Sequence, residues 1–363
     1  QDGMVYWPGF EGALTTQLLA EQDLRKYDQI LFGVKFPDWQ RIAEAYPDPS
    51  APFWKEREIF SRIGEIAAPI YHIGGMQNVG NGELGDCCGG DSLRNYLKGK
   101  SGPHPGRHHV ILGNWSHGDS TPTGDGSNLD PLLRNRIPAL MDHYLQGKPL
   151  PFRDAAVLIA SNDKSRSWQS SVYPLRELKR QVLFFRRDGQ SYFLSKEMPG
   201  IAGEADFSSY EDTPAKLNDL MNLRPDPKQT LAFDYVAQEN TPILGNMKVD
   251  LHVRLNVPQA DVFALPILID RNGIPHVITI CKLGGRVFRV DGVARVRTSS
   301  CPVMANLKAG EKLRVYITSN FYPLFARNTH QAIKHFYDGF LDAKIDLLHS
   351  RDFPSQIRFT VEP

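Results

Sequence analysis

The chain has 363 residues, 41% hydrophobic and 23% charged, and this length and balance favour a globular protein with two domains. Its 42 basic and 41 acidic side chains give a net charge of +1 and form no block of like charge, which argues against nucleic acid as a partner. No apolar run approaches the roughly 20 residues of a membrane span, so we expect no membrane association. The four cysteines make no disulfide framework at this length, which favours a cytoplasmic protein.

The first 66 residues carry helical patterns separated by prolines. The stretches ALTTQLLAEQDLRKY and PDWQRIAEAYPDP both have the apolar spacing of amphipathic helices. We expect residues 1–66 to form a helical cap region.

Residues 67–118 alternate between strand and helix patterns. The apolar run PIYHIGG ends in two glycines and is followed by the loop MQNVGNGELGDCCGG, a short helix over DSLRNYLKG and a second apolar run, HHVILG. Strand, helix and strand in this order predict a βαβ unit with parallel strands and a right-handed crossover.

A longer helix is predicted over LDPLLRNRIPALMDHYLQG. Its apolar residues recur at helical spacing and include Leu133, Ile137 and Leu140, so that one face of the helix can cover a sheet. Residues 67–150 are therefore predicted to be part of an α/β domain.

Residues 151–363 consist of short apolar segments separated by turns. In VDLHVRLNV, Val249, Leu251, Val253 and Leu255 alternate with polar residues, as expected of a strand with one buried face. Many such segments with DG and NG turns predict an all-β domain in which two antiparallel sheets pack as a sandwich or jelly roll. Residues 200–228, rich in Pro, Asp and Glu, are expected to be irregular.

One histidine lies where open α/β sheets bind ligands. His117 follows the run HHVILG in the turn GNWSHGD, and Asn78, Glu83 and Asp86 follow the preceding strand. Loops at the carboxyl ends of neighbouring parallel strands converge, so one of these three side chains could orient the imidazole of a general base. The alternative is a histidine that only hydrogen-bonds its own turn.

Three other histidines cluster in GPHPGRHHVIL. His104, His108 and His109 have no carboxylate at metal-ligand spacing, so we expect solvated loop histidines rather than a metal site. No glycine-rich phosphate loop is present, and no cofactor is predicted.

Four stretches of the sequence together resemble a known family. GNWSHG resembles the G-P-W-S-H-G around the catalytic histidine of the X-Pro dipeptidyl-peptidase and cocaine esterase (CocE/NonD) family of serine hydrolases, and SNFYPLFARN resembles that family's S-S-x-F-P-x-F-x-R-N. The order of the motifs along the chain also resembles that of the family: PIYHIGGMQN, then GNWSHG, then IPALMDHYLQGKPLP, then SNFYPLFARN. The resemblance extends from about Pro52 to the C-terminus. The resemblance implies the C-terminal half of an α/β-hydrolase domain with a helical cap, followed by a jelly-roll (galactose-binding-like) sandwich domain. It makes His117 the general base of a catalytic triad.

The sequence departs from the family at two points. Where the family has the aspartate of a G-W-x-D pattern, this chain has Asn78, and the loss of that charge in a serine triad can cost on the order of 10⁴ in turnover. The family's nucleophile is the serine of a G-x-S-Y-x-G elbow, and no G-x-S-x-G occurs in the 363 residues.

Two functions follow from this pattern. In the first, a second chain supplies the N-terminal half of the hydrolase domain with the serine, and the assembled protein cleaves a small-molecule ester or amide; it could also form an oligomer. Its catalytic residues here would be His117 and Asn78, with Glu83 or Asp86 as a reserve carboxylate. In the second, the chain is a pseudoenzyme or repurposed pocket that binds a partner or steers a cyclisation or isomerisation.

Overall fold

The computed structural model describes fifteen parts of the chain. These are residues 52–56, 59–75, 89–113, 115, 130–160, 167–173, 175, 178–201, 204–209, 222–278, 283–298, 301–319, 328, 330–331 and 341–362. Of the predicted cap region, the structure describes the short helix α4 (Pro52–Lys55) and the 3₁₀ helix η1 (Phe60–Glu65). The two longer cap helices lie outside the described residues.

The predicted βαβ unit is confirmed. Strand β1 (Ile70–Gly75) leads into helix α5 (Gly89–Lys100) and, after the short 3₁₀ helix η2 (Pro105–Arg107), into strand β2 (His108–Gly113). β1 and β2 pair in parallel, from Ile70 opposite His108 to Gly75 opposite Gly113. Every residue of β2 is buried, which is typical of a parallel strand covered on both faces.

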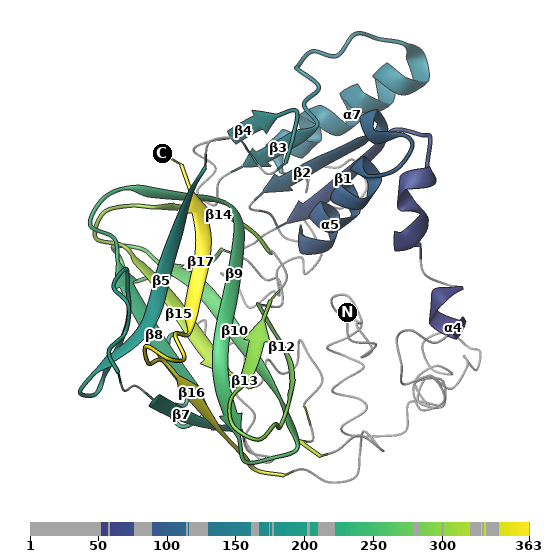
Figure 1. Cartoon of the computed structure of the whole chain (residues 1–363). Helices are drawn as coiled ribbons and strands as arrows, with labels where there is room; N and C mark the ends of the chain where they lie inside the picture. The colour runs from purple at the N-terminus through teal and green to yellow at the C-terminus, as the bar shows by residue number, and fades with distance from the viewer. Residues whose placement is uncertain are drawn as a thin grey trace, which may run out of the picture.

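Helices cover both faces of this sheet (Figure 1). On one side, Leu93 and Tyr96 of α5 pack against alternate residues of β2, Val110 and Leu112. On the other side, α7 (Pro131–Gln146) packs Leu133 against Ile111 and Leu158. The α7 helix begins with the Asp130 carboxylate accepting a hydrogen bond from the Leu132 amide and ends at the left-handed Gly147, so both of its ends are capped.

The first sheet extends beyond the boundary predicted at residue 150. Its strand order is β1-β2-β3-β4, where β3 (Val157–Ala160) is parallel to β2 and β4 (Ser167–Ser170) is antiparallel to β3. Residues 157–160 fall within the range 151–363 that the sequence pattern predicts to be the all-β domain. A short apolar run has the same composition in either kind of sheet, and in the structure this run pairs with β2.

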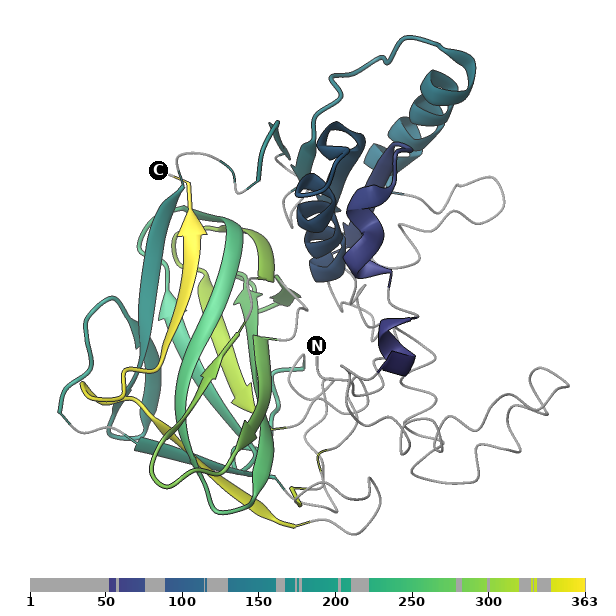
Figure 2. The ribbon, with the colours of Figure 1, turned by 45° about the vertical axis from the view of Figure 1, so that its right-hand side comes forward.

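The remaining described strands form one large, mostly antiparallel sheet that folds over a core of its own (Figure 2). They are β5 (Lys179–Asp188), β6 (Ser191–Ser195), β7 (Glu204–Ser209), β8 (Thr230–Val236), β9 (Thr241–Leu255), β10 (Gln259–Ile269), β11 (Pro275–Val277), β12 (Leu283–Phe288), β13 (Ala294–Arg297), β14 (Cys301–Leu307), β15 (Lys312–Thr318), β16 (Ala343–Leu348) and β17 (Gln356–Val361).

The core of the large sheet follows the alternation in the sequence. Val249, Leu251, Val253 and Leu255 of β9 are buried in one cluster with side chains of β5, β8, β10, β15 and β17. This confirms the strand with one buried face. The region predicted to be irregular contains strand β7, which pairs with β16, so that prediction was wrong over these residues.

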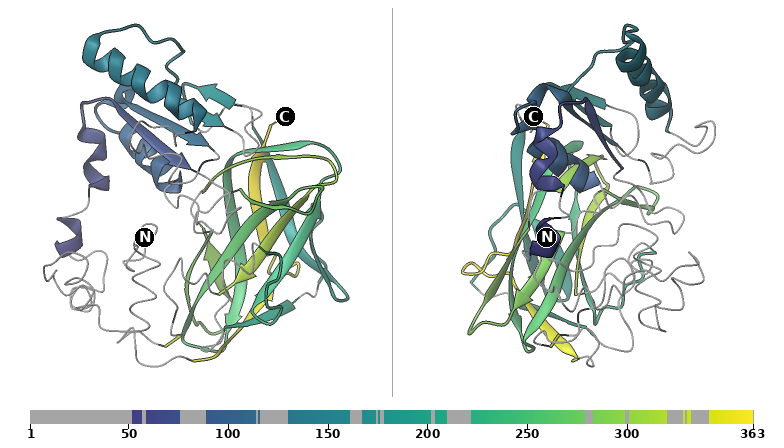
Figure 3. Two further views of the ribbon diagram at one scale, coloured as in Figure 1. Left: turned by 180° about the vertical axis from the view of Figure 1, so that it is seen from behind. Right: turned by 90° about the vertical axis from the view of Figure 1, so that its right-hand side faces the viewer.

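The two sheets share a hydrophobic cluster, and Figure 3 shows them side by side from behind. Leu244 of β9 and Met304 of β14 are buried against the same group of residues as Leu112 of β2. Beside this cluster, the indole Nε1 of Trp168 donates to the Glu362 carboxylate at 3.1 Å. The α/β part is therefore packed onto one end of the β-rich part. None of the described helices is long and apolar enough to cross a membrane.

Candidate active site

The two loops that carry the predicted site residues leave the same edge of the first sheet. β1 ends at Gly75 and β2 ends at Gly113, and these two residues are opposite each other in the strand pairing. Asn78 comes three residues after the first, and His117 four residues after the second. The start of each loop is thus fixed by the register of two paired strands.

The four predicted side chains lie outside the described residues. Asn78, Glu83 and Asp86 fall between β1 and α5, and His117 falls between Trp115 and α7. The structure brings together the strand ends from which they follow, and their contacts stay predictions.

Trp115 packs across the ends of both strands and is almost completely buried. A Cβ atom at Gly75 would lie 2.1 Å from the carbonyl oxygen of Trp115, and one at Gly113 would lie 2.1 Å from its indole ring. Both positions therefore need glycine because the backbone and ring of Trp115 occupy the space of a side chain. The chain that leads to His117 consequently passes over the end of the strand that leads to Asn78.

Helix α5 fixes the other side of the β1 loop. The hydroxyl group of Ser92, in its first turn, donates to the carbonyl oxygen of Ile73 at 3.0 Å, while Leu93 and Tyr96 are buried against the sheet. The described elements on either side of residues 76–88 thus belong to the same βαβ unit.

The histidine pair at the start of β2 is buried, which corrects the prediction of solvated histidines. His108 is fully buried, and its Nδ1 lies 3.3 Å from Nε2 of His72 on β1, with the two rings stacked. Burial lowers the pKa of His72 to about 4, and the neighbouring rings of His108 and His109 lower it further. Burial also lowers the pKa of His108, with a smaller contribution from the positive charge of Lys100. His108 and His109 belong to β2, a strand buried on both faces, so of the three clustered histidines only His104 is exposed as expected.

A histidine and a carboxylate do meet, at the opposite end of these strands. His109 Nδ1 lies 3.5 Å from Oδ1 of Asp154, and its ring stacks on Tyr71, whose hydroxyl group donates to the same oxygen at 2.9 Å. Tyr71 and His109 are the second residues of β1 and β2. The pair links the sheet to the segment before β3.

The sequence patterns did not predict the position of Trp115, the pair of His72 and His108, or the pair of His109 and Asp154. The available signal was a set of polar or titratable residues inside two short apolar runs, IYHIGG and HHVILG, where a buried polar group needs a partner. Among the residues that the structure describes, no three His, Cys, Asp or Glu side chains are grouped to hold a metal ion.

The chain is similar to solved structures, while no family model and no curated protein sequence matches it. An aminopeptidase from a marine sediment archaeon of the Thaumarchaeota superposes with a TM-score of 0.71 and 16% identity, over 90% of this chain and 60% of its own. An α-amino acid ester hydrolase gives 0.69 and 14%, over 99% of this chain and 66% of its own.

A CocE/NonD family hydrolase from Staphylococcus aureus gives a TM-score of 0.65 and 15% identity, over 99% of this chain and 65% of its own. The chain thus spans less than two thirds of the length of each of these three proteins. At these identities the likeness concerns the fold. The chain has the fold of the CocE/NonD hydrolases, an α/β-hydrolase domain with a β-rich domain, as the resemblance in its sequence implied.

Proposed function

We propose that this chain is the C-terminal part of a serine hydrolase that cleaves an ester or amide bond, with His117 as the general base. Asn78 is the side chain that orients the imidazole, and Glu83 or Asp86 is the reserve carboxylate. The β-rich part is a jelly roll in this proposal, and the catalytic serine and the oxyanion hole come from polypeptide outside the 363 residues.

The observation that carries the proposal is the register of β1 and β2. Gly75 and Gly113 are paired, and Trp115 passes over both strand ends, so the chain enters the His117 loop directly beside the Asn78 loop. This is the edge at which open α/β sheets bind their ligands. The resemblance of GNWSHG to the family's histidine motif and the likeness in fold add independent support.

The first sheet and the sequence both support a second polypeptide segment. Among the described residues, β1 is the end strand of a four-stranded sheet, and the 363 residues contain no G-x-S-x-G motif. An end strand presents backbone groups that a further strand can pair with. The proposed N-terminal half would add its strands there, and its serine would then follow a strand on the same edge as His117.

Labelling with a fluorophosphonate, which reacts with activated serines, tests the hydrolase directly. The natively purified protein is labelled, denatured and separated, and the intact mass of every chain is measured. We expect the label on a partner chain with a G-x-S-Y-x-G motif, and we expect His117→Ala to abolish labelling while the exposed His104→Ala leaves it unchanged. Labelling that persists in His117→Ala would refute its role as the base.

A second function is favoured by one residue. Asn78 stands where the family has an aspartate, and an amide supplies no negative charge to an imidazolium. A pocket that binds a partner or steers a cyclisation or isomerisation needs no such charge. Absence of any labelled chain in active, intact material favours this function over hydrolysis.

A further inference from the structure

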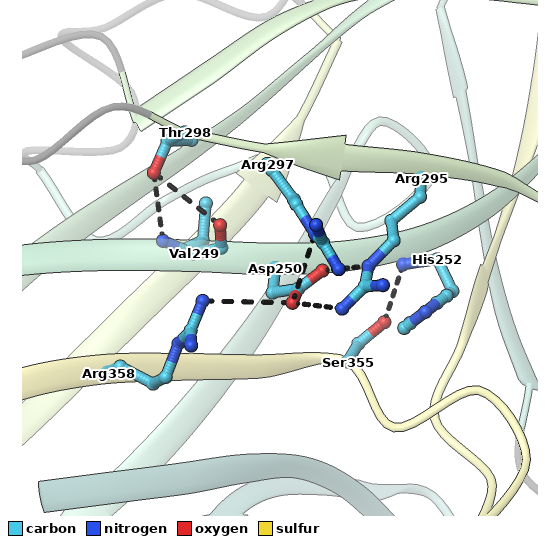
Figure 4. Close-up of polar contacts among 8 residues, drawn as sticks. All are labelled: Val249, Asp250, His252, Arg295, Arg297, Thr298, Ser355 and Arg358. Atoms are coloured by element: carbon cyan, nitrogen blue, oxygen red, sulfur yellow. Dashed lines mark hydrogen bonds and ion pairs between the residues drawn. The ribbon is translucent and has the colours of Figure 1, made fainter.

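A cluster of arginines surrounds one buried carboxylate on the β-rich part (Figure 4). Asp250 lies on β9 between two core residues, so its side chain faces away from the hydrophobic core, and it is only 2% exposed. Arg295 of the neighbouring strand β13 binds it through two hydrogen bonds, of 2.6 Å to Oδ1 and 2.5 Å to Oδ2. This bidentate pair neutralises the carboxylate, and Asp250 has a lowered pKa although its burial acts in the opposite direction.

Two further guanidinium groups approach the same carboxylate without binding it. Nε of Arg297 on β13 and Nη2 of Arg358 on β17 each lie 3.8 Å from Oδ2 of Asp250, which is within ion-pair distance and beyond hydrogen-bond distance. Nε of Arg358 is buried and has no hydrogen-bond partner among the described residues. Each of the two arginines therefore has N–H groups close to this carboxylate that form no hydrogen bond with it.

The cluster carries an excess of positive charge. Three arginines lie around the single carboxylate, and Lys248 lies opposite Arg358 in the strand pairing. These four basic side chains and Asp250 together have a formal charge of +3. The whole chain has a net charge of only +1. Because Arg297 is 63% exposed, this charge is accessible to solvent.

The basic area is small. Further along β9, Arg254 lies opposite Asp346 of β16. On β5, the guanidinium group of Arg186 binds the carboxylate of Glu197. Acidic groups thus bound the cluster along two directions. Its size and charge match one compact, doubly charged anion better than a polymer, which would extend over Asp346.

We propose that Arg297 and Arg358 form a binding site for a phosphate group, on the outer face of the large sheet and separate from the edge that carries His117. Planar guanidinium groups donate two parallel hydrogen bonds to the oxygens of a tetrahedral anion, and two of them on the strands that flank β9 can bind it from two sides. The two hydrogen bonds from Arg295 offset the negative charge of Asp250, which weakens the repulsion between this carboxylate and the anion. The phosphate is either the free ion or a monoester of a small molecule.

Titration of the full chain with inorganic phosphate and, separately, with glycerol phosphate tests the site. Binding is measured by calorimetry at an ionic strength of about 0.01 M, where exposed charges are least screened. We expect one saturable site that weakens at least tenfold in Arg297→Gln and is unchanged in Arg153→Gln, an exposed arginine on the α/β part. Tighter binding of glycerol phosphate identifies a monoester as the ligand, and tighter binding of inorganic phosphate identifies the free ion.

Two results would overturn the proposal. One is the absence of saturable binding in the folded chain, with folding checked by circular dichroism. The other is equal weakening in Arg297→Gln and Arg153→Gln, which would indicate a general charge effect. A short single-stranded DNA is titrated in parallel, and binding of it that exceeds both phosphates and is lost in Arg297→Gln would replace the single-anion site with a polyanion surface.

Discussion

Acid is expected to destabilise the α/β part through the buried pair of His72 and His108. In the folded chain the pKa of His72 is about 4, because burial and the neighbouring imidazoles disfavour its charged form, while an unfolded histidine has a pKa of about 6.5. Between these values the unfolded state binds more protons than the folded state. The free energy of unfolding therefore falls as the pH falls from about 6.5 to about 4, and His72 has no effect above that range.

The size of the effect follows from the difference in pKa. Each pKa unit corresponds to about 1.4 kcal/mol, so His72 alone removes about 3 kcal/mol across this range. That is a large part of the 5–15 kcal/mol by which domains are typically stable. His108 shifts in the same direction and adds to the loss.

Urea unfolding at several pH values measures this effect, and hydrogen exchange of the peptides covering β1 and β2 assigns it to their sheet. We expect His72→Gln, which keeps a polar group and removes the titration, to flatten the fall in stability below pH 6.5. His143→Gln, on α7, is the matched control and should leave the fall unchanged. Equal pH dependence in wild type and His72→Gln would refute the reasoning.

Three further substitutions test other parts of the molecule. Gly75→Ala should destabilise the chain by about 1–3 kcal/mol in thermal unfolding, because the added Cβ would meet the backbone of Trp115. The control is Gly106→Ala, which should leave the stability unchanged because its added Cβ meets nothing within 4 Å. If the protein hydrolyses esters, Asn78→Asp should raise kcat by up to about 10³–10⁴, and an unchanged kcat would remove Asn78 from the mechanism. Asp250→Asn should cost about 1–3 kcal/mol in urea unfolding by breaking the bidentate pair with Arg295, and a loss near zero would contradict that pairing.

The parallel arrangement of β1 and β2 could be predicted because it depends on local patterns. Two apolar runs ending in glycine, with a loop and a helix between them, leave one sterically favoured connection, and the structure has it. The alternation from Val249 to Leu255 fixed the buried face of β9 for the same reason.

The rest depends on contacts between distant residues. Val157–Ala160 could not be assigned to the first sheet from four apolar letters, because the partner that decides it is β2. The burial of His108 depends on helix α5 and on His72, neither of which its own neighbours in the sequence reveal. Arg295 and Arg297 are two residues apart, but Asp250 and Arg358 are distant from them in the sequence, so the cluster forms only when β9, β13 and β17 pair.

The cluster that joins the two sheets limits how this molecule could be engineered. Leu244 and Met304 complete the core against which Leu112, one residue before the end of β2, is packed. Expressing either part by itself would expose that apolar surface to water and promote aggregation. A chimera that exchanges the β-rich part must therefore carry matching side chains at these contacts, because the strand that leads to His117 rests on them.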